Sequence, residues 1–398
     1  MRGKKVARTW KWDPSLYAPA RYRRACKYET FVPDPIAGES IELSGRIAGV
    51  VSDAEQAIGA LNTASQPALA PLARLLLRTE SIASSRIEGL QVGIQQIARA
   101  EVQVETGGRV GPTVLEVVGN IDAMELAVQQ AAMSVELGVA HICEVHRRLM
   151  VHSPNCRTAG VIRTDQNWIG GNDYNPCGAD YVPPPPENVP ALLEDLCRAI
   201  ADESLPPLVQ AALVHAQFET IHPFADGNGR TGRALIHVVL RRRGIADRYV
   251  PPISVVLAAE RDAYISGLVD FREGRLGSWT ERFAEAGARA AGLASEYLAA
   301  TNQLMDEWRE RLAEGASPRA DAAAWAVIEI LPAHPIVTAP VAAAATGRSK
   351  AAIHQALTQL AECGVLEPLS ASKRNRSWEA AGLLELLESL EAGRVRRK

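Results

Sequence analysis

The sequence predicts a mainly α-helical protein with few and short strands. Apolar residues make up 47% of the 398 residues and aromatic residues only 5%, a composition typical of alanine-rich helical proteins. In most segments the apolar residues recur three or four positions apart, which is the period of an amphipathic helix. Between residues 163 and 186, Gly, Asn and Pro crowd together, and there the pattern predicts a small β-hairpin instead. The length leaves room for two or three domains.

The first 110 residues divide into a tail and a helical region. Residues 1–30 are basic and lack the apolar core of a signal peptide, so we expect a solvated tail rather than a binding arm. In residues 31–110 the apolar residues recur at helical spacing, and the clearest run extends from Leu75 to Ile82. A polar stretch that contains Glu88 follows this run.

Residues 111–293 are expected to form the core of the protein. Helical periodicity predicts helices near residues 113–132 and 139–150, one on either side of residues 222–229, and more helix near 254–292. His146 lies on an amphipathic stretch, where a core histidine is commoner than a metal ligand. Two extended runs, residues 166–169 and 179–182, flank the Gly/Asn/Pro-rich turn and predict the β-hairpin. The prolines at 183–186 exclude helix after it.

The stretch from His222 to Arg233, HPFADGNGRTGR, gathers the residue types that handle a nucleoside triphosphate. A histidine can accept a proton from a nucleophile, an aspartate can hold a divalent metal ion, and arginines can neutralise phosphates. The glycines lie where the second predicted helix begins, and backbone N–H groups at a helix N-terminus bind anions. A Gly-Asn-Gly turn alone is more often structural, but the complete string is far more specific.

The C-terminal residues predict a separate unit. The pattern of residues 294–318 predicts a helix followed by a short linker. Residues 319–398 predict three helices, then two strands with a basic turn between them. The third of these helices, residues 349–362, has a predicted buried face of Ile353, Leu357 and Leu360.

Whole-chain features limit the function classes. The formal net charge of −3 carries no global nucleic-acid signal. The six cysteines include no C-x-x-C pair, so we expect neither a zinc site nor a disulfide framework, in keeping with a reducing cytosol. No apolar run reaches the roughly 18 residues that span a membrane. We therefore expect a cytoplasmic protein with no membrane partner.

The string at residues 222–233 resembles the Fic family motif, H-x-F-x-[DE]-G-N-G-R-x-x-R, and matches it at every specified position. The resemblance implies a Fic-type helical core and a protein adenylyltransferase, which transfers AMP from ATP to a hydroxyl of a target protein or of itself. It implies His222 as the base and Asp226 as the ligand of Mg2+. It also implies contacts to the phosphates from Gly227, Asn228, Gly229, Arg230 and Arg233.

Three other segments are similar to parts of the same family. Residues 84–89, SSRIEG, fit the inhibitory pattern [ST]-x-x-x-E-[GN], which implies that Glu88 pairs with Arg233 and restrains the enzyme. The C-terminal unit resembles a winged helix-turn-helix, which commonly follows cores of this subclass. The predicted hairpin resembles the flap that docks a strand of the target, which implies docking at Gln166, Asn167, Trp168 and Ile169.

Other functions stay open on the sequence alone. The winged helix would suit a DNA-binding regulator with a nucleotide-sensing core, or else a module for protein contacts or dimerisation. Removal of AMP at the same site, with Glu88 positioning water, is a further alternative. Phosphotransferases of the family have lysine where this chain has Gly229, so Gly229 favours nucleotide transfer. Helical surfaces would also allow a homodimer.

Overall fold

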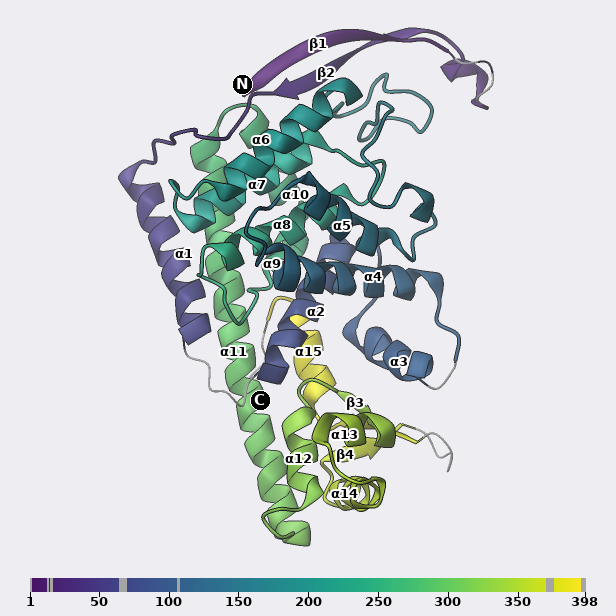
Figure 1. The fold of residues 1–398 in the computed structure, drawn as a ribbon, viewed down its shortest axis with the longest axis vertical. Coiled ribbons are helices and arrows are strands. Elements are labelled where there is room, and N and C mark those ends of the chain that lie inside the picture. Colours follow the sequence, from purple (N-terminus) through teal and green to yellow (C-terminus); the bar gives the residue numbers. More distant parts are fainter. Residues whose placement is uncertain are drawn as a thin grey trace. The chain divides into compact units, whose positions relative to one another are not determined.

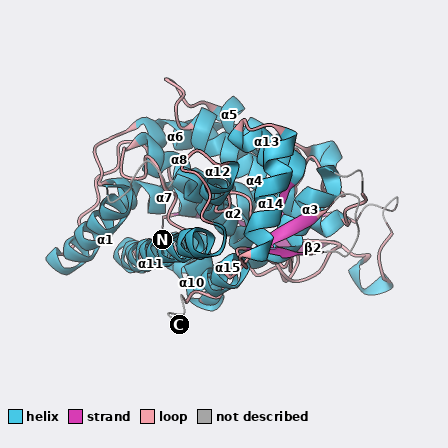
Figure 2. Cartoon of the chain, turned by 90° about the horizontal axis from the view of Figure 1, so that it is seen from below, coloured by secondary structure: helices cyan, strands magenta, loops and turns pink. Residues whose placement is uncertain are grey.

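The computed structural model describes residues 2–12, 14, 17–63, 70–105, 108–369 and 376–394. Helices dominate it, and the described strands form two small antiparallel sheets (Figure 2). The predicted mainly α fold class is therefore confirmed. The chain folds as two compact units. Unit 1 comprises Met1–Asp53, Asp122–Gly244 and Arg261–Glu285, and unit 2 comprises Ala54–Ile121, Ile245–Glu260 and Ala286–Lys398.

Unit 1 is built around α7 (Pro207–Ile221), which is buried from Leu208 to Ile221. A helix that is buried on every side is the centre of a core rather than part of its surface. Its packing partners are α6 (Val189–Ala201), α8 (Asn228–Arg242) and α10 (Arg261–Arg272), and α5 (Val139–Met150) packs against α6 and α8. The Trp279 indole N–H donates to the carbonyl of Ala212 at 2.9 Å and so fixes the next helix to α7.

The predicted tail at residues 1–30 is wrong, because most of it folds. β1 (Gly3–Trp10) and β2 (Cys26–Pro33) form an antiparallel hairpin in register from Gly3–Pro33 to Trp10–Cys26, drawn in purple in Figure 1. The end of β2 is anchored, since Thr30 and Phe31 are buried and the Phe31 N–H donates to Val182 O at 2.9 Å. Basic residues on the exposed side interrupt the apolar alternation, which explains the error.

The predicted flap forms only one bridge of β-structure among the described residues. Ile169 pairs with Tyr181, and the Ile169 N–H donates to Tyr181 O at 2.8 Å. The turn between them is shaped by Asn172, whose side-chain oxygen accepts from the N–H groups of Tyr174 and Asn175 at 2.9 and 3.0 Å. Side-chain contacts of this kind take the place of the ladder that the alternation predicted.

Unit 2 contains the helix that precedes Glu88. This helix, α2 (Ala70–Ile87), packs against α9 (Ile253–Ala259), where the buried Glu80 carboxylate accepts from Ser254 N and Oγ at 2.7 and 2.6 Å. Of the other helices before the C-terminal part, α3 (Ile94–Glu105) belongs to unit 2. Three contribute residues to both units: α1 (Gly45–Thr63), α4 (Pro112–Leu126) and the long α11 (Leu276–Ala316). The π-helical turn after α4 belongs to unit 1. Most of residues 294–318, predicted as a helix and a linker, is helical, because α11 continues to Ala316.

The C-terminal part of unit 2 is a small mixed domain. In order it contains α12 (Ala323–Ile330), β3 (Ile336–Thr338), α13 (Ala339–Thr346), α14 (Lys350–Glu362), β4 (Leu366–Pro368), β5 (Ser377–Ala380) and α15 (Leu383–Glu391). β5 lies between β3 and β4 in an antiparallel sheet. Ile353, Leu357 and Leu360 are buried, as predicted. The basic turn at residues 373–375 lies outside the described residues.

Within the described ranges, every helix is too short or too polar to cross a lipid bilayer.

Candidate active site

The motif forms the turn between α7 and α8. α7 ends at Ile221, and His222 follows in the left-handed conformation with φ 49° and ψ 60°. The His222 N–H still donates to Phe218 O at 2.9 Å, which closes the last turn of the helix. Among the described residues only His222 and Ser317 have positive φ without being glycine. Such a conformation costs about 1–3 kcal/mol and persists only where surrounding contacts hold it, as they often do at functional sites.

Arg163 supplies many of these contacts. Its side chain lies at the start of the flap, is 6% exposed, and donates only to backbone carbonyls. Burial lowers the pKa of this guanidinium to about 10. The acceptors are the carbonyls of His222 at 2.8 Å, Pro184 at 2.6 Å, Asp165 at 3.1 Å and Ile221 at 3.3 Å. One residue therefore ties both limbs of the flap to the backbone of the predicted base. Arg163 was not predicted as a site residue, and no signal in the sequence marks it.

Two asparagines hold the rest of the turn. The Asn167 side-chain amide donates to the carbonyls of His222 and Phe224 at 3.2 and 3.0 Å. Asn228 accepts from Phe224 N at 2.9 Å and donates to Phe224 O at 2.8 Å, so both of its side-chain groups serve the loop. The backbone N–H of Asn228 begins α8 and has no carbonyl acceptor inside that helix, and the phosphate contact predicted for Asn228 stays a prediction.

His146 on α5 supports the turn from the other side. Its ring stacks on the fully buried ring of Phe224, with centroids 3.7 Å apart and planes 3° apart. Nδ1 accepts from Gly160 N at 2.9 Å, which places the proton on Nε2, and Nε2 donates to Asp226 O at 2.9 Å. Burial lowers the His146 pKa to about 4, so the ring is neutral. The expected core histidine is therefore also a support of the motif.

Asp226 has the features of a metal ligand. One carboxylate oxygen accepts from Gly227 N at 2.6 Å and the other from the Asn155 amide at 2.9 Å. The side chain is 42% exposed, whereas the Arg230 guanidinium, 3.9 Å away, is only 4% exposed. A carboxylate held this way and open to solvent fits Mg2+, which prefers oxygen ligands and shares them with phosphates.

The start of α8 concentrates positive potential. Gly227, with φ 74°, is the residue before the helix, and a Cβ there would lie 2.9 Å from the Met150 sulfur. Gly229, Arg230 and Arg233 follow in the first two turns, all buried. Because Arg230 and Arg233 lie three residues apart, they share a helix face near the N–H groups of the first turn. The combination is an anion site of the kind that a triphosphate would occupy.

Glu88 follows α2 directly, and its N–H donates to Ser85 O at 3.1 Å. The two serines of this segment, Ser84 and Ser85, are buried, and Asn120 donates to Ser85 Oγ at 3.0 Å. The two serines are therefore packed inside unit 2, whereas Glu88 itself is exposed. Arg233 belongs to unit 1, so the predicted pairing of Glu88 with Arg233 stays a prediction.

The flap residues have separate tasks. The Gln166 amide donates to Pro183 O at 3.0 Å and so links the two limbs. The Trp168 indole N–H donates to Asn172 O at 2.6 Å, and its ring lies edge-on to Trp10 with centroids 5.8 Å apart. Trp168 therefore packs beneath the hairpin, whereas Ile169 is 42% exposed. Docking of a target strand at these residues stays a prediction.

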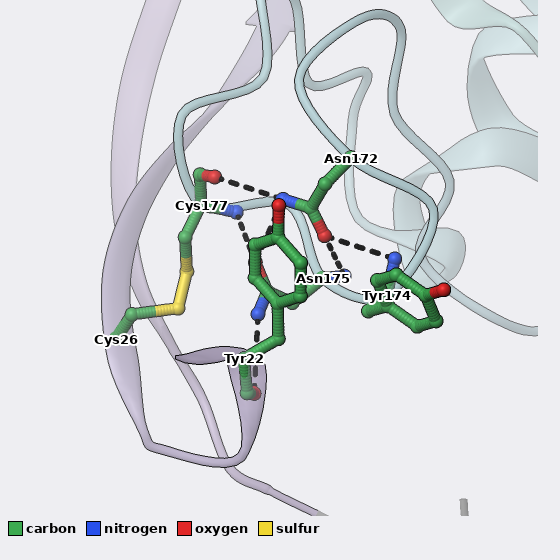
Figure 3. Close-up of a disulfide and its surroundings, with 6 residues drawn as sticks. All are labelled: Tyr22, Cys26, Asn172, Tyr174, Asn175 and Cys177. Atoms are coloured by element: carbon green, nitrogen blue, oxygen red, sulfur yellow. Dashed lines mark hydrogen bonds between the residues drawn. A yellow bond between two sulfur atoms is a disulfide. The ribbon is translucent and has the colours of Figure 1, made fainter. Parts of the chain in front are cut away.

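A disulfide joins the flap to the N-terminal hairpin, which contradicts the expectation that the cysteines form none. Cys26 at the start of β2 is bonded to Cys177 in the flap turn, with Cα atoms 6.2 Å apart (Figure 3). The two residues are 151 positions apart, so no spacing rule could pair them. The rings of Tyr22 and Tyr174 stack beside the bond at 5.1 Å. Disulfides are typical of oxidising compartments, and the cytoplasmic location stays a prediction.

Comparisons with known proteins point to one family. Residues 136–240 match the Fic/DOC family model, and residues 49–129 match the Fic/DOC family N-terminal model. The protein adenylyltransferase Fic of Drosophila erecta is 30% identical over 216 residues, which cover 51% of this chain and 40% of the relative. That of Drosophila willistoni is 31% identical over 192 residues, 48% of this chain and 35% of the relative. The chain thus spans at most about two fifths of these relatives.

Two solved structures share the fold. A Fic family protein from Desulfovibrio desulfuricans G20 aligns over 86% of this chain and 98% of its own, with a TM-score of 0.51 and 21% identity. Fic-1 (residues 134–508) from C. elegans aligns over 63% of this chain and 72% of its own, with a TM-score of 0.50 and 23% identity. At these identities the likeness is one of fold.

Proposed function

The chain belongs to the Fic/DOC family, and on that premise we propose that it transfers AMP from ATP to a hydroxyl side chain of a target protein. The observation that carries this proposal is the turn between α7 and α8. It sets His222 in a held left-handed conformation, beside a solvent-facing Asp226 and a helix N-terminus backed by Arg230 and Arg233.

Each of these residues has a role that follows from its chemistry. His222 accepts the proton of the target hydroxyl while the hydroxyl oxygen attacks the α-phosphorus of ATP. The bond from that phosphorus to the bridging oxygen breaks, and diphosphate leaves. Arg230, Arg233 and the N–H groups at residues 227–229 stabilise the charge on the departing oxygens. Mg2+ would be held by Asp226, and it would neutralise phosphate charge there.

We propose further that Glu88 restrains the reaction. Its carboxylate would form a bidentate pair with Arg233 and occupy the guanidinium that the γ-phosphate needs. ATP bound without that contact would present its α-phosphorus poorly, and misplacement of about 1 Å can cost roughly 100-fold in rate. The burial of Ser84 and Ser85 supports the idea that this segment has a defined position in its own unit. The alternative role, in which Glu88 positions water to remove AMP, uses the same carboxylate.

Labelling with ATP tests the function. Wild type, Glu88→Gly and Glu88→Gly/His222→Asn would be incubated with Mg2+ and with ATP labelled at either the α- or the γ-phosphate. We expect label from the α position only, raised in Glu88→Gly and lost in the double variant. Transfer of γ-label would overturn AMP transfer, and label that survives in the double variant would remove His222 as the base. Equal labelling of wild type and Glu88→Gly would reject the restraint.

The C-terminal domain carries a second candidate function. We infer that residues 319–394 form a winged helix, because α12, β3, α13, α14, β4 and β5 follow in that order and β5 lies between β3 and β4. Arg348 and Lys350 are exposed at the start of α14, where a recognition helix would meet phosphates. DNA binding with a steep salt dependence would support this function, and binding that ignores salt would reject it. A homodimer stays a prediction.

A further inference from the structure

Positive charge is concentrated at the N-terminal end of a chain whose net charge is negative. Residues 2–29, here called the basic hairpin, contain nine Lys and Arg but only two Asp and Glu, whereas the whole chain has 43 and 46. Several of its cations have partners inside the molecule, such as Lys5 with Glu29 and Arg8 with Glu187. Four are exposed and, among the described residues, are not within ion-pair distance of a carboxylate: Lys4, Lys11, Arg24 and Lys27.

The basic hairpin is attached to the flap rather than to a remote face. Cys26 is bonded to Cys177, and the Tyr22 ring stacks on Tyr174 (Figure 3). At the same end of the strands, where Trp10 pairs with Cys26, the Trp10 ring packs edge-on against Trp168. All these contacts lie within unit 1, which also contains His222. A molecule that binds the exposed cations therefore comes to lie next to the segment where the target is proposed to dock.

The chemistry of the surface favours a polypeptide over a nucleic acid. Nucleic-acid strands are usually held by cations together with aromatic rings on which bases stack. Here Trp10 and Tyr22 already pack against flap residues, and Arg21 lies over the Tyr22 ring at 4.7 Å. Apart from Tyr17, which is 84% exposed, the described residues leave for a partner mainly a set of point charges on flexible stems. Carboxylates of an acidic protein segment complement such a set without needing a fixed geometry.

We propose that the basic hairpin is a docking surface for an acidic segment of the target protein, adjacent to the hydroxyl that receives AMP. This inference rests on the proposed function. A single exposed ion pair is weak, but four of them together should strengthen binding by roughly 10-fold. The ion pairs increase the affinity for the target and act before the chemical step. Their effect should therefore appear in the KM for the target rather than in kcat.

The test separates docking from catalysis. The probes are a fluorescent Glu-rich peptide with a single Thr and its counterpart with Gln for Glu. The proteins are the Glu88→Gly enzyme and the same enzyme with Gln at residues 4, 11, 24 and 27. A matched control carries Gln at four exposed cations of unit 2 that lie outside α14, which are Arg99, Arg109, Arg319 and Arg394. Peptide binding is measured by fluorescence anisotropy at two salt concentrations, and AMP transfer to the peptides is measured with α-labelled ATP.

We expect the Glu-rich peptide to bind about 10-fold more tightly than the Gln peptide, and the hairpin variant to lose this preference while the control keeps it. In AMP transfer, the KM of the hairpin variant for the Glu-rich peptide should rise by a similar factor, whereas its kcat and its KM for ATP should not change. Equal binding of both peptides, or equal losses in both variants, would overturn the docking surface. A single-stranded oligonucleotide that displaces the peptide and binds more tightly through the same four residues would overturn it in favour of a nucleic acid. Selective binding with no AMP transfer to any protein or peptide would leave the surface standing and reject the proposed function.

Discussion

Replacing Arg163 with Met should slow AMP transfer by disturbing a backbone rather than by removing a reacting group. The Arg163 guanidinium donates four hydrogen bonds to carbonyls, one of them to His222 O at 2.8 Å. Hydrogen bonds to charged groups contribute about 1.5–3 kcal/mol each. Burial of the charged guanidinium opposes this stabilisation, because lowering the pKa of Arg163 from 12.5 to about 10 corresponds to a free-energy cost of about 3 kcal/mol. We therefore expect a net destabilisation of about 3 kcal/mol or more.

The effect on rate follows from the position of the base. Without its 2.8 Å donor, the His222 carbonyl is held by Asn167 alone among the side chains described around it, and a shift of about 1 Å would lower kcat roughly 100-fold. The KM for ATP should change little, because Arg163 contacts only backbone of the flap and the turn. Arg163→Lys keeps the charge and can reach some of the carbonyls, so it should recover part of the rate.

The assay combines urea unfolding with α-label transfer in the Glu88→Gly enzyme. The control is Arg198→Met, which removes an arginine of the same unit that is 64% exposed and paired at 3.2 Å with Asp195. If Arg163→Met does not fold, Asn167→Ala removes two bonds to the same turn and serves instead. A folded Arg163→Met enzyme with the kcat of its parent would refute the reasoning.

Three further predictions follow from the site. The His146 pKa is about 4 when folded and about 6.5 when unfolded, so the stability that depends on its neutral ring is complete above pH 6.5 and is lost as the pH falls toward 4. Urea unfolding should show a loss from pH 7 to 5 that is about 2 kcal/mol larger in wild type than in His146→Asn, and an equal loss in both would contradict this. Reduction of the disulfide should lower the melting temperature of wild type but not that of Cys177→Ser. In the chain-entropy model a cross-link over 151 residues stabilises the fold by up to about 5 kcal/mol. Calorimetry with and without reductant measures the two melting temperatures, and equal shifts in both proteins would contradict the prediction. Gly227→Ala should lower the free energy of unfolding by about 2–4 kcal/mol, since the φ of Gly227 is 74° and the new methyl group would lie 2.9 Å from the Met150 sulfur. The control is Gly111→Ala, because no atom lies near the methyl group added there. Equal melting temperatures of the two variants would contradict the prediction.

Much of the site could be predicted because its chemistry is local. The turn between α7 and α8 lies in one short stretch, and the burial of Phe224 and of the helix after Gly227 follows from residue type and spacing. Sequence patterns carry that kind of information well, since period and turn residues act over a few positions.

The features that could not be predicted depend on backbone carbonyls, which every residue carries, or on pairs of residues far apart in the sequence. Arg163 binds backbone carbonyls, which no sequence pattern specifies. The bond between Cys26 and Cys177 joins residues 151 positions apart. The basic hairpin was wrongly predicted as a tail because its lysines and arginines obscure the alternation of a strand. The buried face of that strand is defined by a tertiary contact, in which Phe31 packs against the flap.

The left-handed backbone at His222 decides how a reagent for trapping the target should be made. An inactive enzyme that still holds its target must keep the loop in its native shape while it lacks the base. Alanine at this position would face the full steric penalty at φ 49°, whereas asparagine populates that region several-fold more often than most residues. His222→Asn should therefore retain the bound conformation that alanine would relax, and it is the better bait for isolating the protein that this chain modifies.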